Sequence, residues 1–94
     1  MKFKIYEVTL EWNTGKDDDK QSFLYADYED AVAKFKELVE EQKKVDWIDE
    51  GLKSESDEFY QYELTEQVDY WYFGVDCFLD RMYSVVVIEE RKVF

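Results

Sequence analysis

The sequence predicts an α+β fold: an antiparallel sheet of four to five strands with one main helix packed on one face. Several segments alternate polar and apolar residues with the two-residue period of a strand, and one segment has helical spacing. These segments follow the order strand, strand, helix, then two or three strands. The chain also holds 8 tyrosines, 7 phenylalanines and 3 tryptophans, whose large rings supply a core.

The N-terminal segment predicts a hairpin. Polar residues alternate over 3–12 with apolar ones, namely Tyr6, Val8, Leu10 and Trp12. The polar run that starts at Asn13 breaks this strand, and we expect a long acidic loop over 16–21. A short second strand follows over 22–26.

The next segment predicts a helix over 28–44. Asp27 is a favourable N-cap residue, and Glu29 and Asp30 place negative charge in the first turn, where the helix dipole favours it. Apolar residues recur at helical spacing: Ala31, Phe35, Leu38 and Val39. We therefore expect Phe35 and Leu38 in the core, and Glu37 and Glu41 in solvent.

The second half of the chain predicts two or three more strands. Residues 46–50 suit one helical turn that Gly51 stops, and 54–58 suits a loop. Strands are expected over 59–66, 68–75 and 83–93, with a connection over 76–82 that has room for one helical turn. The aliphatic run from Val85 to Ile88 is typical of a strand well inside a sheet.

Length and composition predict a single domain over residues 1–94. The chain has no proline and three glycines, which leaves little linker material. No apolar run resembles a signal peptide, and the longest aliphatic run is far too short to span a bilayer. We expect a cytoplasmic protein.

Catalysis is not expected. The chain has no histidine that could activate Cys77, its single cysteine. Two carboxylates suffice for glycosidase-type chemistry, but among 24 acidic residues a close pair is unavoidable and therefore uninformative. We expect no enzymatic activity and no cofactor.

No metal site is expected either. The run Asp17-Asp18-Asp19 offers the oxygen ligands that calcium prefers. The calcium loop of an EF-hand also needs glycine at its sixth position and glutamate at its twelfth, and the twelfth position here is Tyr28. Three scattered glycines likewise cannot build a phosphate-binding loop.

Charge is the most informative feature of the sequence. The net charge is −12, which disfavours direct binding to nucleic acid or to an anionic membrane surface. Residues 46–80 hold 11 acidic residues and one basic residue, Lys53, a net of −10. Aromatic residues lie among these acids, so the segment is not a disordered acidic tail.

This distribution predicts a partner-binding surface of carboxylates. Acidic residues two apart on a strand face the same way, about 6.6 Å apart, and can approximate a row of nucleic-acid phosphates. The partner would be a basic, nucleic-acid-binding protein. The alternative is a general protein-interaction or structural domain whose acidity serves solubility. The expected partner-binding residues are Asp46, Asp49, Glu50, Glu55, Asp57, Glu58, Glu63, Glu66 and Asp69.

Three features of the chain together resemble a known class of proteins: its small size, its strand–strand–helix–strand order, and the acidic residues listed above among aromatic ones. This class is the small acidic anti-defence proteins of phages and mobile elements, which include several anti-CRISPR proteins. The resemblance is one of overall style along the whole chain, and it assigns no residue a role. It implies a stoichiometric inhibitor that occupies the basic nucleic-acid channel of a host nuclease, such as a CRISPR effector.

Overall fold

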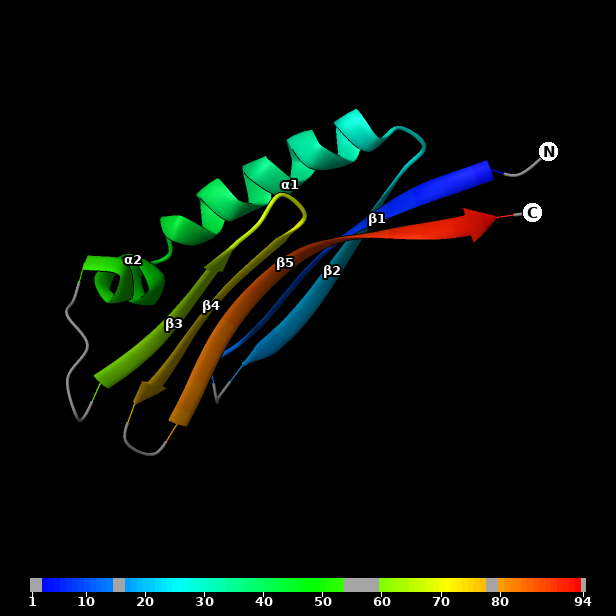
Figure 1. The fold of residues 1–94 in the computed structure, drawn as a ribbon. Helices are drawn as coiled ribbons and strands as arrows, with labels where there is room; N and C mark the ends of the chain where they lie inside the picture. The colour runs from blue at the N-terminus through cyan, green and yellow to red at the C-terminus, as the bar shows by residue number, and fades with distance from the viewer. Residues whose placement is uncertain (1–2, 15–16, 54–59, 78–79, 94) are drawn as a thin grey trace.

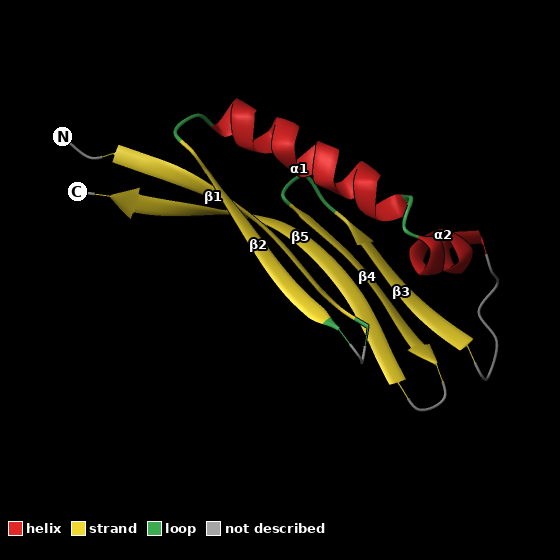
Figure 2. Cartoon of the chain, turned by 180° about the vertical axis from the view of Figure 1, so that it is seen from behind, coloured by secondary structure: helices red, strands yellow, loops and turns green. Residues whose placement is uncertain are grey.

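Among the residues that the structure describes, a five-stranded antiparallel sheet carries two helices on one of its faces (Figures 1 and 2). The computed structural model describes residues 3–14, 17–53, 60–77 and 80–93. The strand order across the sheet is β2-β1-β5-β4-β3, and the predicted α+β class is confirmed. The elements are β1 (Phe3–Asn13), β2 (Asp18–Tyr25), α1 (Tyr28–Lys43), α2 (Asp46–Lys53), β3 (Tyr60–Glu66), β4 (Tyr70–Cys77) and β5 (Asp80–Val93).

The last strand of the chain is the central strand of the sheet. β5 pairs with β1 from Phe3–Val93 to Asn13–Tyr83, and with β4 on its other side. Val86 is fully buried beneath the helices, whereas Val85 and Val87 are half-buried on the opposite face. The position expected for the aliphatic run is therefore confirmed.

The core lies between the helices and one face of the sheet. Residues that are partners across neighbouring strands share a face, so Val8 of β1 and Ile88 of β5 both point toward the helices. The face opposite the helices is called the open face below. The core residues are Val8, Leu10, Ala31, Phe35, Leu38, Val39, Ile48, Trp71, Phe73, Val75, Val86 and Ile88.

Helix α1 follows the prediction closely. The backbone of Asp27 is extended, with φ −107° and ψ 134°, as an N-cap residue requires. Its side chain makes no capping hydrogen bond; its carbonyl accepts the Ala31 N–H instead, at 3.2 Å. Phe35 and Leu38 are buried and Glu37 and Glu41 are exposed, so the expected register of the helix is confirmed.

Helix α2 is longer than the single turn expected. It continues through Gly51 to Lys53 because Ile48 and Leu52, four residues apart, both pack against the core. That packing outweighs the cost of a helical glycine, about 1 kcal/mol. None of the described helices has the length and the apolar character needed to cross a membrane.

Two strands start earlier than the sequence predicts. β2 begins at Asp18 rather than Ser22, so most of the expected acidic loop is paired with the end of β1. β2 is an edge strand with exposed side chains at that end, so charged residues stay in solvent while the backbone pairs. β5 begins at Asp80, and pairing of Met82 with Val75 replaces the helical turn considered over 76–82.

The burial of Phe35 predicts a large effect of truncation. Phe35→Ala should lower the free energy of unfolding by about 3–5 kcal/mol, since it removes a buried ring and leaves a cavity. Glu37→Ala, on the exposed side of the same helix, should change it by less than about 0.5 kcal/mol. Urea unfolding followed by circular dichroism measures both. Similar stabilities of the two variants would contradict the assigned register of α1.

Candidate protein-binding surface

The described carboxylates of the predicted site come from three neighbouring elements. The β3 edge of the sheet and the nearby α2 lie on the same side of the molecule in both views (Figures 1 and 2). Glu55, Asp57 and Glu58 lie outside the described residues. The other six, called the acidic flank here, are Asp46, Asp49 and Glu50 of α2, Glu63 and Glu66 of β3, and Asp69 of the β3–β4 turn.

The strand alternation of β3 sends its two acids in opposite directions. Glu66 is the partner of Trp71 and lies on the helix side, whereas Glu63 is the partner of Gly74 and lies on the open face. They are three residues apart, so the two-residue spacing of a phosphate-like row does not occur on β3. The acidic flank therefore surrounds the β3 edge instead of forming one flat row.

The flank is largely exposed to solvent. All its members are exposed except Asp49, which is half-buried. Lys43 of α1 reaches Glu66 at 3.8 Å and Glu40 at 3.9 Å. The β3–β4 hairpin, residues 60–77, contains four acidic residues and neither lysine nor arginine.

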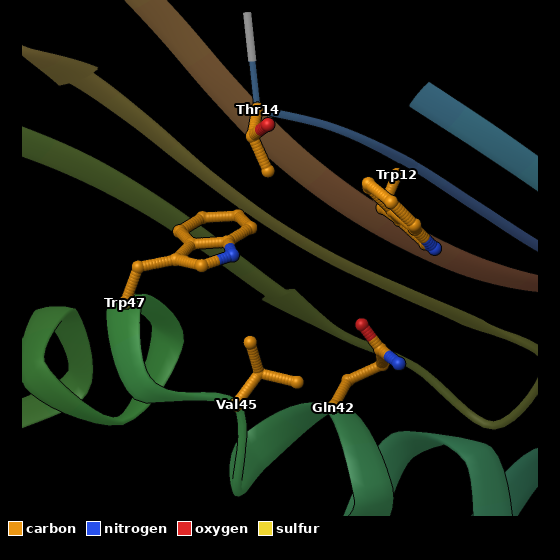
Figure 3. Close-up of a pocket in the computed structure, with 5 residues that line it drawn as sticks. All are labelled: Trp12, Thr14, Gln42, Val45 and Trp47. Carbon is orange, nitrogen blue, oxygen red and sulfur yellow. The ribbon is translucent and has the colours of Figure 1, made fainter. Parts of the chain in front are cut away.

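A pocket of about 330 Å³ lies where α1 meets α2 (Figure 3). The indoles of Trp12 and Trp47 stand on either side, with Gln42 and Val45 below them in this view. The Ser84 hydroxyl donates a hydrogen bond of 2.9 Å to the side-chain oxygen of Gln42 and so fixes that amide. Trp47 belongs to α2, the helix that also carries Asp46, Asp49 and Glu50, and the pocket offers a largely apolar cavity for a partner side chain.

An aromatic pair on the open face is a second feature that sequence reasoning missed. The rings of Tyr72 and Tyr83 are stacked, with centroids 6.3 Å apart. The Arg81 guanidinium donates a hydrogen bond of 2.9 Å to the Tyr72 hydroxyl, and the Tyr83 hydroxyl donates one of 3.4 Å to Glu11. Tyr72 lies over Gly74, whose missing side chain makes room for the ring. Only the cross-strand register, which is absent from the sequence pattern, brings these residues together.

Comparisons with protein-family models, curated proteins and solved structures each found no match. Among the residues that the structure describes, no three carboxylate or thiol side chains are grouped so that they could hold a metal ion. The side chain of Cys77 lies outside the described part of the chain. The function therefore has to be argued from the acidic flank, the tryptophan pocket and the tyrosine pair.

The position of Tyr72 over Gly74 predicts that Gly74→Ala is destabilising. A β-carbon at this position would lie 2.8 Å from two ring carbons of Tyr72 and would force the ring off its stack with Tyr83. We expect a loss of about 1–3 kcal/mol in the free energy of unfolding, as for other overpacked sites. In a Tyr72→Ala background the loss should disappear, and a double-mutant cycle measures this. An equal loss in both backgrounds would contradict the steric explanation.

Tyr83 predicts a dependence of stability on alkaline pH. Burial, and then the negative charge of Glu11, raise the pKa of the Tyr83 hydroxyl above its ordinary value of 10.0. The stability that this shift supplies is complete below the unfolded pKa and is lost as pH rises through the folded pKa. Wild type should therefore lose stability relative to Tyr83→Phe as the pH rises above about 10, and the difference between their melting temperatures measures this loss. A constant difference would show that Tyr83 does not titrate differently in the folded protein.

Proposed function

We propose that this protein is a non-catalytic, cytoplasmic inhibitor that binds the basic surface of a nucleic-acid-binding protein and keeps nucleic acid away from it. One such partner is a CRISPR effector nuclease. The observation that carries it is the net charge of −10 over residues 46–80, whose described carboxylates are mostly exposed along the β3 side of the fold.

The electrostatic argument is one of complementarity. A groove that binds nucleic acid is lined with lysine and arginine, and a folded surface of carboxylates can replace phosphates as their partner. A net charge of −12 also accelerates the encounter with a basic protein. Self-repulsion of this size opposes folding, so an attractive partner would offset a cost that the free protein carries.

Charge alone gives attraction without specificity. Two aromatic features, one on each face of the sheet, can supply that specificity. Binding energy in protein interfaces concentrates in tryptophan, tyrosine and arginine. These residue types lie on the framework of sheet and helices at two places: the pocket between Trp12 and Trp47, and the pair Tyr72–Tyr83 with Arg81. They support a shaped interface over an unspecific acidic coat.

Displacement of a labelled DNA duplex from purified nucleic-acid-binding proteins, CRISPR effector nucleases included, tests the proposal. At about 0.1 M salt the protein should displace the duplex from at least one of them, and at about 1 M salt it should not bind, because the Debye length falls from ~10 Å to ~3 Å. Binding that is unaffected by salt would contradict the electrostatic mechanism. A lack of displacement across the panel would favour acidity that serves only solubility.

Charge reversal separates a shaped acidic surface from total charge. The triple variant Glu50→Lys, Glu63→Lys, Asp69→Lys on the flank should weaken partner binding at least about tenfold, since close charge pairs contribute several kcal/mol. The control, Glu29→Lys, Glu37→Lys, Glu41→Lys on α1, changes the net charge equally and should weaken binding much less. Isothermal titration at fixed salt compares them, with melting curves to verify folding. Equal losses would reduce the proposal to unspecific acidity.

A further inference from the structure

The outer edge of β3 is an unpaired edge of the sheet among the described residues. The Gln67 N–H donates to the Tyr70 carbonyl at 2.8 Å, so Gln67 and Tyr70 form a hydrogen-bonded pair at the end of the hairpin. Bonded and non-bonded pairs alternate along an antiparallel ladder. Thr65 and Glu63 therefore bond to β4, whereas the N–H and C=O groups of Leu64 and Glu66 point outward from the sheet.

A groove runs beside this part of the edge. It has a volume of about 590 Å³ between α1 and the β3–β4 turn, and its walls include Val32, Phe35 and Val39 of α1 and Val68 of the turn. Val68 is 74% exposed and Leu64 is 39% exposed, which is high for apolar side chains. Leu64 and Glu66 are partners of Phe73 and Trp71, so their side chains lie on the helix side, as the groove does.

We propose that β3 and this groove bind an extended segment of the partner as a sixth strand, one in which lysine or arginine alternates with apolar residues. The backbone of that strand bonds to Leu64 and Glu66, and its apolar side chains enter the groove beneath α1. Its basic side chains point to the opposite, open face, where they meet Glu63 at the β3 edge. This inference names the kind of partner segment and rests on the proposed function.

The charges select such a partner over a second copy of the chain. Two β3 strands side by side would bring together hairpins with four acidic residues each and no basic residue. Like charges facing each other across a strand pair are destabilising. Two lysines line the groove: Lys43 is paired with Glu40 and Glu66, and Lys36 is exposed beside the apolar wall that α1 provides.

Two peptides of equal charge test the inference with the full-length protein. The probe is an acetylated peptide of alternating lysine and valine, about seven residues long, the length of a typical strand. The control replaces valine with proline, which cannot join a strand ladder. We expect the lysine–valine peptide to slow hydrogen exchange of the Leu64 and Glu66 amides measured by NMR, and the lysine–proline peptide to leave exchange unchanged.

Proline substitutions on the two edge strands provide the matched variants. Leu64→Pro removes an N–H that points outward and leaves the hydrogen bonds between β3 and β4 intact. It should lower the affinity for the lysine–valine peptide by about tenfold, roughly what a lost hydrogen bond contributes. Ser22→Pro, on β2, also removes an outward N–H, because the Thr14 N–H donates to the Asp17 carbonyl and sets the phase of that hairpin. Ser22→Pro should leave the affinity unchanged.

The variant Lys36→Trp covers the case in which Leu64→Pro fails to fold. Lys36 is exposed and lines the groove, so a tryptophan there fills the groove without touching the sheet ladder. Lys36→Ala removes the same charge but leaves the groove open, so the tryptophan variant should bind the lysine–valine peptide more weakly than the alanine variant. Equal binding of both peptides with no amide protection would overturn strand addition and leave the proposed function standing. Protection on β2 instead of β3 would also overturn it. Failure of both peptides to bind at low salt would contradict the proposed function as well.

Discussion

The pairing of β1 with β5 is the constraint on which the rest of the structure depends. It joins residues from opposite ends of the chain, from Phe3–Val93 to Asn13–Tyr83. β2 extends the sheet from β1, and β4 and β3 extend it from β5, so neither half of the sheet has its place without this pair. Closing so long a loop costs entropy before any contact rewards it. Burial of apolar side chains on the helix side of these two strands offsets that entropy cost. The residues buried there are Val8, Leu10, Val86 and Ile88.

Local patterns predicted most of the elements because each pattern has one physical cause. The stripe that includes Phe35 and Leu38 predicted α1, because a helix on a sheet must bury one side. The polar end of β2 was missed, because backbone pairing with β1 does not require apolar side chains on an edge strand. The full length of α2 was missed because tertiary packing of Ile48 and Leu52 overrides the local preference of Gly51. Strand order could not be predicted, since it is decided by pairs distant in sequence.

The candidate site was predictable only in part, because contacts between residues distant in sequence build much of it. Charge counts located most of the acidic excess in residues 46–80, and the described members of the predicted site lie on α2, on β3 and in the β3–β4 turn. The spacing of Glu63 and Glu66 already sends them to opposite faces, so a single row of carboxylates was not available on β3. The tryptophan pocket and the tyrosine pair depend on contacts between Trp12 and Trp47 or between Tyr72 and Tyr83, residues brought near each other only by the fold.

The two edge strands of the sheet, β2 and β3, differ in the charges that protect them from pairing with another chain. An unpaired edge strand is a template for unwanted pairing, and charge is one protection against it. On β2 the charges are of both signs, because Lys20 follows Asp18 and Asp19, so charge repels a second copy less there than on β3. On the β3–β4 hairpin all the charges are negative, so a second copy is repelled. A surface of one sign excludes its own kind and at the same time attracts a chain of the opposite sign. In the proposed complex, the negative charge that disfavours pairing of the β3 edge with a second copy is therefore also the charge that selects the partner strand.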